Sequence, residues 1–335
     1  MMKHKCFEKL IIAEIGSVHD GSFGNALKLV DVAKECGAKV VKFQVHFAEE
    51  ETLENAISPI HFSEETRYKY FKRTAFTIEQ WKKILEYTHK NKLLFMASVF
   101  SKKSLDLLLK IRSDYIKIPS GEVTNLPLLH NISKIKLPVV LSTGMSNWDE
   151  IDKSIETLKK IKNLAILQCS SIYPCSNKLA GLNIIQQMKN RYNLPTGFSD
   201  HTSGSTAAIG AIFNGATIIE KHLTFSKKMY GSDAKFAMEP TEFKKFVNFL
   251  KEAWVLKESI VDKNDISNYK ETRMVFEKSI VAIKNLKKGH LLRLQDLNFK
   301  KPGDGIRAFD YKQIIGKKIN KSVKKNHKFS TKDLI

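Results

Sequence analysis

The chain contains 335 residues, of which 42% are hydrophobic and 27% charged, so it can bury the core of one large domain and a small one. It shows no uncharged apolar stretch of about 18 residues, the length that a membrane span needs. Glu14 interrupts the first apolar run, and no signal-peptide cleavage site follows. The four cysteines show no Cys-x-x-Cys spacing, which favours reduced thiols. We therefore expect a globular cytoplasmic protein with no membrane segment.

The net charge of +21 is unevenly distributed along the chain. Residues 277–335 contain 16 lysines and arginines against five acidic residues, which indicates a separate C-terminal domain. No recognition helix, zinc-finger spacing or aromatic-basic strand motif accompanies this charge. We therefore expect no nucleic-acid partner, and we interpret the lysines as a solvated surface that also attracts anionic substrates.

Short apolar runs alternate with amphipathic segments along most of the chain. Strands are predicted at residues 10–15, 39–44, 93–98, 115–118, 138–142, 164–169, 195–199 and 217–222. Helices are predicted at residues 23–36, 78–91, 101–111, 148–162, 181–191, 203–214 and 241–257, with Ser22, Thr77 and Ser101 as capping residues.

Eight strands alternating with helices over roughly 250 residues are typical of a closed (β/α)8 TIM barrel. The strands are continuously apolar, as in a parallel sheet that is covered on both faces. A doubly wound open sheet is the alternative. Against it, the segment IGSVHDGSFG after the first strand lacks the G-x-G-x-x-G spacing of a dinucleotide site.

Polar side chains lie at or after the end of almost every predicted strand. The active sites of such barrels lie at the carboxyl ends of the strands. We therefore expect at one rim Glu14, Lys42, Gln44, Lys117, Ser120, Glu122, Ser142, Ser171, Tyr173, Ser199, His201, Glu220 and His222. Lysines in short apolar strands are costly to bury without a partner. With the serine-rich strand ends, Lys42 and Lys117 predict a site for a phosphate and a carboxylate.

Two predicted strands lead to histidines, His201 in GFSDHTSG and His222 in IIEKH. A single histidine at a strand end is usually structural and bonded to the backbone. A pair on adjacent barrel strands can instead hold one divalent metal, with water or substrate oxygens completing the coordination.

Eight collinear motifs resemble those of the sialic acid synthases, enzymes of the N-acetylneuraminate synthase type. They are IIAEIGSVHDGSFGNA, GAKVVKFQ, YIKIPSGE, VVLSTGMS, CSSIYPC, GFSDHTSG, ATIIEKH and GSDAKFAMEP. The remainder of the chain resembles the small antifreeze-like SAF domain of this family. The resemblance implies a barrel at residues 1–256, a linker at 257–276 and a SAF domain at 277–335.

The resemblance implies condensation of phosphoenolpyruvate with an N-acetylated hexosamine such as N-acetylmannosamine, which gives a sialic acid and inorganic phosphate. It implies a metal, usually manganese with magnesium or cobalt as alternatives, on His201 and His222. It also implies a domain-swapped homodimer, in which the SAF domain of one subunit caps the site of the other. The residues matched to phosphoenolpyruvate are Lys42, Gln44, Lys117, Ser120, Ser142 and Ser199.

Four further residues match positions that serve the sugar or proton transfer, namely Glu14, Glu122, Tyr173 and Asp233. Glu14 or Glu122 is the expected general acid or base, and Lys117 is the third expected catalytic residue. In the SAF domain Lys301 replaces the family's sugar-binding arginine, with Arg307 as the alternative. Further departures from the family pattern lie at Val18, Ser98, Ser171 and Ala234.

These departures leave alternatives open. The first is a synthase of legionaminic or pseudaminic acid that uses a diacetamido-trideoxyhexose. The second is a Schiff-base mechanism with Lys117 or Lys221 as nucleophile. The third is a sugar-binding protein without catalysis, which the presence of both histidines and both strand lysines disfavours.

Overall fold

The structure is a computed structural model that describes residues 5–57, 65–231 and 233–335. The chain divides into two compact units, Met1–Ser259 and Ile260–Ile335, and each is described by itself. In the part of the chain described, no helix combines the length and the apolar character that crossing a membrane requires.

The first unit is a closed barrel of eight parallel strands in sequential order. Its strands are β1 (Leu10–Gly16), β2 (Val40–Val45), β3 (Leu94–Val99), β4 (Tyr115–Ile118), β5 (Val139–Ser142), β6 (Leu164–Cys169), β7 (Thr196–Asp200) and β8 (Ile218–His222). β1 pairs with β8, which closes the barrel. The predicted (β/α)8 barrel is confirmed, and the open-sheet alternative is wrong.

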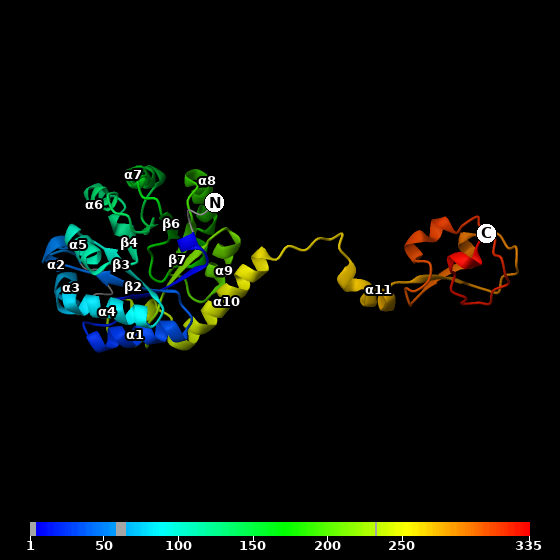
Figure 1. Ribbon diagram of the computed structural model, residues 1–335, viewed down its shortest axis with the longest axis horizontal. Coiled ribbons are helices and arrows are strands. Elements are labelled where there is room, and N and C mark those ends of the chain that lie inside the picture. Colours follow the sequence, from blue (N-terminus) through cyan, green and yellow to red (C-terminus); the bar gives the residue numbers. More distant parts are fainter. Residues whose placement is uncertain (1–4, 58–64, 232) are drawn as a thin grey trace. The chain divides into compact units, whose positions relative to one another are not determined.

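Helices lie outside the strands (Figure 1). Seven of them correspond to predicted helices: α1 (Phe23–Glu35), α4 (Ile78–Lys90), α5 (Lys102–Ile111), α7 (Trp148–Leu158), α8 (Leu182–Tyr192), α9 (Thr206–Phe213) and α10 (Pro240–Glu258). Ser22, Thr77 and Ser101 accept backbone N–H groups of the first turns, as expected of N-caps. Three helices of this unit were not predicted, namely α2 (Ala48–Glu51), α3 (Arg67–Thr74) and α6 (Leu126–Ile132).

The barrel interior changes from apolar to polar along the strands. Near the amino ends of the strands it is filled by an apolar cluster that includes Phe7, Leu10, Ile12, Val40, Met96, Tyr115, Val140, Ala165 and Ile218. Side chains two residues apart on a strand point to the same side. The residues two positions further along the strands therefore also point inward. On most strands they are polar, and they include Glu14, Lys42, Ser98, Lys117, Ser142 and Glu220.

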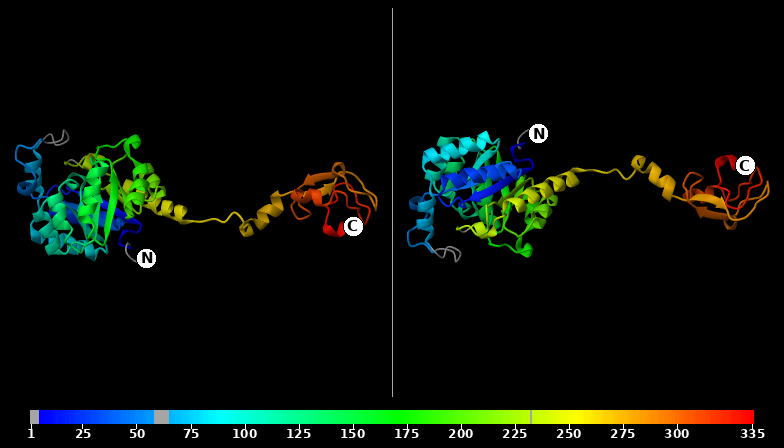
Figure 2. Two further views of the ribbon diagram at one scale, coloured as in Figure 1. Left: turned by 90° about the horizontal axis from the view of Figure 1, so that it is seen from above. Right: turned by 90° about the horizontal axis from the view of Figure 1, so that it is seen from below.

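The second unit is small and β-rich. After α11 (Lys270–Phe276), β9 (Ser279–Ala282) pairs with the antiparallel β10 (Leu297–Lys300). Figure 2 shows these strands in orange, followed by turns that run to the C-terminus. Its own core consists of Ile280, Ala282, Leu286, Leu292, Leu297, Ile314, Ile319, Val323 and Phe329.

A buried aspartate arrangement occurs twice in this unit. Asp296 accepts hydrogen bonds from His290 Nε2 at 2.8 Å and from the Arg293 backbone N–H at 3.1 Å. The same arrangement follows 37 residues later at Asp333, His327 and Ser330. Although burial raises the pKa of each carboxyl, these donors and a nearby lysine hold both pKa values below the ordinary range of aspartate.

Candidate active site

A cavity of about 510 Å³ opens at the carboxyl ends of the barrel strands. Its position is the one expected of an active site in this fold. It brings together thirteen residues proposed from the sequence: Glu14, Lys42, Gln44, Lys117, Ser120, Ser142, Ser171, Tyr173, Ser199, His201, Glu220, His222 and Asp233.

Glu220 is the central carboxylate of this cavity, although the sequence alone assigned it no role. Its Oε2 lies 2.8 Å from Lys117 Nζ, and its Oε1 lies 3.3 Å from Lys42 Nζ. Ser199 Oγ donates to Oε1 at 3.0 Å. Burial opposes ionisation, but Lys117 and Lys42 hold the pKa of Glu220 well below its usual range. The rim position predicted for Glu220 is confirmed, and it lies two residues before His222 on β8, hence on the same face.

The two buried lysines have different carboxylate partners. Lys42 also contacts Glu14 Oε1 at 3.0 Å. Although burial lowers the pKa of Lys42, Glu14 and Glu220 together raise it above its ordinary value. Burial lowers the pKa of Lys117, whose ion-pair partner is Glu220. Both amines are therefore held inside the barrel, where an incoming anion can reach them.

The turn after β4 and the end of β5 offer hydroxyl groups to the cavity. Ser142 Oγ is buried and has no hydrogen-bond partner among the described residues. Ser120 Oγ accepts the backbone N–H of Gly144 at 3.0 Å. A Cβ on Gly144 would lie only 2.8 Å from Ser120 Oγ and would overlap Ser171, so this close approach requires glycine. Ser142 is thus available to a substrate oxygen.

His201 and His222 face one another, with ring centroids 5.5 Å apart. His201 Nδ1 donates to the Ser170 carbonyl oxygen at 3.0 Å, which leaves Nε2 for a ligand bond. His222 Nδ1 is buried without a hydrogen bond in the described chain, 4.0 Å from Asp233 Oδ2. Burial lowers the pKa of His222 and favours the neutral ring that binds metals.

The two imidazoles fit a metal site in which water or substrate completes the coordination. Among the residues described, no group of three or more histidine, cysteine, aspartate or glutamate side chains is placed to hold a metal ion. Tyr173 covers the pair from one side, with its ring centroid 4.2 Å from that of His201. These residues can therefore supply two protein ligands.

Glu14 carries an unused carboxylate oxygen at the cavity. Its Oε1 accepts from Gln44 Nε2 at 2.9 Å and contacts Lys42, while Oε2 is buried and has no partner in the described ranges. Gly16 beside it has a φ of 55°, and a Cβ there would lie 2.6 Å from Asp233 Oδ2. Glycine therefore keeps the space between Glu14 and Asp233 free of a side chain.

Glu122 is not part of the described cavity lining. It lies in the 3-10 turn Ser120–Glu122, where its Oε2 accepts from Asn125 Nδ2 at 2.7 Å. Burial raises the pKa of Glu122. Of the two carboxylates considered for proton transfer, the structure places Glu14 in the cavity.

Lys301 and Arg307 belong to the second unit. Lys301 Nζ lies over the Phe276 ring, 4.8 Å from its centroid. Arg307 Nε donates to Asp310 Oδ2 at 3.0 Å. Their expected contact with a sugar in a partner subunit, and the swapped dimer itself, stay predictions.

Lys221 is not suited to be a Schiff-base nucleophile in this cavity. It points away from the side of β8 that carries Glu220 and His222 and forms a buried ion pair with Asp200 Oδ2 at 2.8 Å. It also lies within 6.0 Å of the centroid of the Phe246 ring on α10. The alternating direction of strand side chains explains this placement, which disfavours Lys221 as a nucleophile in this cavity.

Residues after β2 complete the cavity wall. His46, Arg67 and Phe71 line it, together with Phe100 after β3. None of them was assigned a role from the sequence. Arg67 and Phe71 lie on α3, a helix that was not predicted. For His46 a signal existed, because it follows Gln44 by two residues and so lies on the same face as the polar layer.

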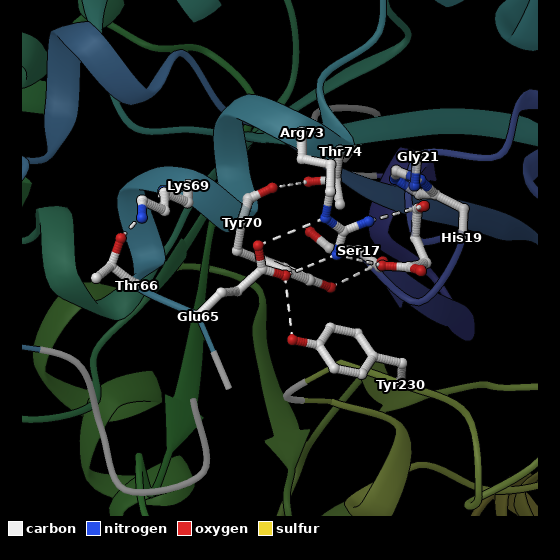
Figure 3. A network of polar contacts seen from close by, with 11 residues as sticks. Ser17, His19, Gly21, Glu65, Thr66, Lys69, Tyr70, Arg73, Thr74 and Tyr230 are labelled. Atoms are coloured by element: carbon white, nitrogen blue, oxygen red, sulfur yellow. Dashed lines mark hydrogen bonds and ion pairs between the residues drawn. The ribbon is translucent and has the colours of Figure 1, made fainter. Parts of the chain in front are cut away.

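A cluster of four polar side chains, which we call the Arg73 cluster, positions α3 (Figure 3). Arg73 Nη2 donates to Glu65 Oε1 at 2.7 Å and to Asp20 Oδ1 at 2.8 Å. The Tyr230 hydroxyl donates to Glu65 Oε1 at 3.1 Å. The cluster therefore joins the loops after β1 and β8 to α3, which carries Phe71 to the cavity.

Comparisons with known proteins cover both units. The sequence matches the NeuB family over residues 29–261 and the SAF domain over residues 277–334. An N,N'-diacetyllegionaminic acid synthase from Campylobacter jejuni is 33% identical over 95% of this chain and 97% of its own length. A pseudaminic acid synthase from the same organism is 30% identical, over 94% of this chain and 93% of its own length. The solved N-acetylneuraminic acid synthetase from Leptospira borgpetersenii superposes with a TM-score of 0.70 at 30% identity, covering 79% of this chain and 90% of that chain.

Proposed function

This chain belongs to the NeuB family and is an enzyme of that family, and we propose that it condenses phosphoenolpyruvate with an N-acetylated aminosugar. The products are a nonulosonic acid and inorganic phosphate. The observation that carries the proposal is one cavity in which Lys42, Lys117 and the free hydroxyl of Ser142 lie with the facing pair His201 and His222.

Lys42, Lys117 and the serines bind phosphoenolpyruvate in this proposal. Two amines offset its negative charge, and the hydroxyls of Ser120 and Ser142 donate to its oxygens. Ser199 lines the same cavity with its hydroxyl bonded to Glu220. C3 of phosphoenolpyruvate forms the new bond to the aldehyde carbon of the open-chain sugar. Water then adds at C2, and the bond between C2 and the phosphate oxygen breaks to release phosphate. The protein binds both substrates in one orientation, which lowers the entropic part of the barrier.

Glu14 is our candidate for proton transfer. Its buried Oε2 has no partner within the described chain, and Asp233 lies across the gap kept open by Gly16. In the proposed reaction Glu14 exchanges a proton with the aldehyde oxygen or with the attacking water. Tyr173 and Asp233 would bind the hydroxyls of the sugar.

His201 and His222 would hold a divalent metal, with manganese as the first candidate and magnesium or cobalt as alternatives. When bound, such a metal supplies Lewis-acid polarisation of the aldehyde. The two rings would contribute nitrogen ligands, and His201 is oriented by the Ser170 carbonyl.

The proposed reaction admits two aminosugars. N-acetylmannosamine is the first candidate, from the motifs shared with sialic acid synthases. A diacetamido-trideoxyhexose is the second, and it is favoured by the 33% identity to a protein named N,N'-diacetyllegionaminic acid synthase.

A direct test measures phosphate release from phosphoenolpyruvate with manganese present. The panel contains N-acetylmannosamine, its 6-phosphate and diacetamido-trideoxyhexoses. Release that depends on one of these sugars supports the proposal and names the substrate. Absence of sugar-dependent release across the whole panel would overturn it.

Removal of the metal tests the histidine pair separately. For the unaltered chain, we expect EDTA to abolish turnover and added manganese to restore it. We expect His201→Ala to bind no manganese in equilibrium dialysis and to show no turnover when manganese is added. The control is His130→Ala, because His130 is exposed and lies outside the cavity lining as described. If His201→Ala keeps normal turnover in EDTA, the metal assignment is wrong.

A further inference from the structure

We propose that His46 and Glu51 form a positioning pair that orients the catalytic carboxylate of Glu14 through Gln44. The inference rests on the proposed function, because it concerns the group that we assign to proton transfer. It adds two residues that touch neither the lysines nor the histidine pair in the contacts described.

A continuous chain of hydrogen bonds leads from Glu51 to Glu14. Glu51 Oε1 lies 2.5 Å from His46 Nδ1, and His46 Nε2 lies 3.0 Å from Gln44 Oε1. Gln44 Nε2 then donates to Glu14 Oε1 at 2.9 Å. Each step joins side chains, so a change at Glu51 reaches the active carboxylate without movement of the barrel strands.

The donors and acceptors of this chain determine where its protons lie. The amide nitrogen of Gln44 faces the carboxylate of Glu14, so its carbonyl oxygen must face His46. His46 Nε2 therefore carries a proton. Nδ1 faces a carboxylate oxygen of Glu51, so a second proton must lie between these two atoms. The ring thus has an acceptor at each nitrogen and fits the imidazolium form.

The surroundings hold the pair in this geometry. The His46 ring is stacked between Phe71, at 3.6 Å and 7°, and Phe100, at 4.2 Å and 22°. The side chains of His46 and Glu51 are 5% and 6% exposed. Rotation of the ring would break both hydrogen bonds and the stack. The pair therefore has one arrangement.

Other charged groups near the pair do not replace its contacts. His19 interacts electrostatically with His46, and Glu122 with Glu51. Arg67 lies over the outer stacking ring, 5.4 Å from the centroid of Phe71. Direct hydrogen-bond contact with the ring nitrogens of His46 comes, in the described chain, from Glu51 and Gln44.

The consequence for Glu14 is a defined division of its two oxygens. Gln44 and Lys42 occupy Oε1, and Oε2 is left for the substrate. If Gln44 turned its amide over, its carbonyl oxygen would face Oε1 and repel it. The pair prevents this, because the protonated Nε2 of His46 is a donor and pairs only with the carbonyl oxygen of the amide.

Kinetics of single and double variants test the pair. In Glu51→Gln the carboxylate that stabilises the second proton is gone, and the amide that replaces it can donate to Nδ1 as well as accept from it. The proton on Nε2, which orients Gln44, is then no longer enforced. We expect kcat to fall by roughly 10- to 100-fold, as for a displaced catalytic group, with little change in KM for phosphoenolpyruvate. His46→Phe keeps the stack of three rings, and we expect its kcat to fall by the same factor. Glu50→Gln is the matched control, since Glu50 is exposed and contacts Lys103.

A double-variant cycle separates positioning from a general structural effect. If the pair acts through Gln44, Glu51→Gln should cause no further loss of kcat in a Gln44→Ala background. Independent, multiplying losses in the double variant would overturn the proposal. So would normal activity of His46→Phe, since the stack alone would then be sufficient.

A spectroscopic measurement needs no substrate and so separates this proposal from the proposed function. The ring nitrogens of the ¹⁵N-histidine-labelled full chain are recorded near neutral pH, and His46 is assigned by the signals lost in His46→Phe. We expect both nitrogens to be protonated, and one proton to be lost in Glu51→Gln. A singly protonated His46 in the unaltered protein overturns the pair. If this signature is present but no sugar in the panel releases phosphate, the proposed reaction alone has failed.

Discussion

At Glu220 one carboxylate contacts two buried amines, Lys117 and Lys42, that lie far apart in the sequence. Ion pairs of this kind rarely add much net stability, because desolvation cancels most of the attraction. Breaking one is costly, since the remaining charge is left buried without its partner. Glu220 is therefore required to keep the two lysines inside the cavity.

We predict that Glu220→Gln destabilises the first unit by about 3–5 kcal/mol, the usual cost of removing one member of a buried pair. Urea unfolding of the full chain, monitored at the barrel transition, measures this. Ser199→Ala is the control and should cost about 1 kcal/mol, because it removes one neutral donor to the same carboxylate. Equal losses of unfolding free energy in the two variants would contradict the assignment of a charged Glu220 paired with two charged lysines.

The same substitution should change the pH dependence of stability. The pKa of Glu220 is depressed in the folded chain, so its contribution is present above the unfolded value of about 4.3 and is lost as pH falls through the folded value. The stability difference between Glu220→Gln and the unaltered chain should therefore narrow below about pH 4. A constant difference from pH 7 downwards would speak against a depressed pKa.

At the scale of elements, α3 depends on the Arg73 cluster for its position. The helix begins at a cap, Thr66, whose hydroxyl accepts the Lys69 backbone N–H at 3.3 Å. Its polar contacts to the rest of the barrel include Arg73 with Asp20. Because the side chain of Arg73 is 43% exposed, each ion pair adds little to global stability. The main effect of the cluster is placement of Phe71 at the cavity.

We predict that Arg73→Gln raises KM for the aminosugar by about tenfold, because the wall that contains Phe71 is displaced. KM for phosphoenolpyruvate, which we place at the lysines, should change little. Steady-state kinetics with each substrate varied in turn measures the difference. Lys72→Gln is the neighbouring control, since its side chain is 61% exposed and pairs with Glu49. An equal rise in both KM values would place the role of the cluster elsewhere.

The elements that sequence analysis missed are short. α2 has four residues, which is too few to show a helical period. α3 has eight residues and is rich in charged and aromatic side chains, so its apolar face is not evident from the pattern. Both lie in the connection after β2, where His46 and Glu51 meet. Part of the cavity wall that was not predicted, Arg67 and Phe71, therefore lies on an unpredicted helix.

For the molecule as a whole, the two units rest on separate cores, and the second is small. A small core buries little apolar surface and gains more from well-placed polar groups. In the second unit the twin arrangements around Asp296 and Asp333 provide such groups. Each carboxylate binds the backbone where the chain turns into a short 3-10 helix.

We predict that Asp333→Asn lowers the stability of the second unit by about 1–3 kcal/mol, the cost of a lost buried charged acceptor. Calorimetry of the full chain should show this in the transition of that unit. The pKa of Asp333 is depressed in the folded chain. Its contribution to stability is therefore present above about pH 3.9, the unfolded value, and is lost as pH falls further. Asp304→Asn is the control, because its carboxylate is 41% exposed. Equal melting temperatures of the second unit in the two variants would show that buried Asp333 does not stabilise it.

The periodic pattern of apolar residues was sufficient to predict the eight strands, seven of the helices and the barrel. Apolar runs of strand length, separated by amphipathic segments, leave few other ways to bury both faces of a sheet. The position of polar residues at the carboxyl ends of the predicted strands also predicted that Glu14, Lys42, Lys117 and the two histidines lie on one rim. These features depend on residues that are close together in the chain, so they can be predicted from short segments of the sequence.

Which side chains contact one another depended on how the barrel closes. Lys117 and Glu220 are 103 positions apart and meet because both point inward at the same level of the closed barrel. The same closure leaves Glu122 outside the described cavity lining and pairs Lys221 with Asp200 on the outer side. Contacts between distant strands depend on register and strand tilt together, and no short stretch of sequence contains either.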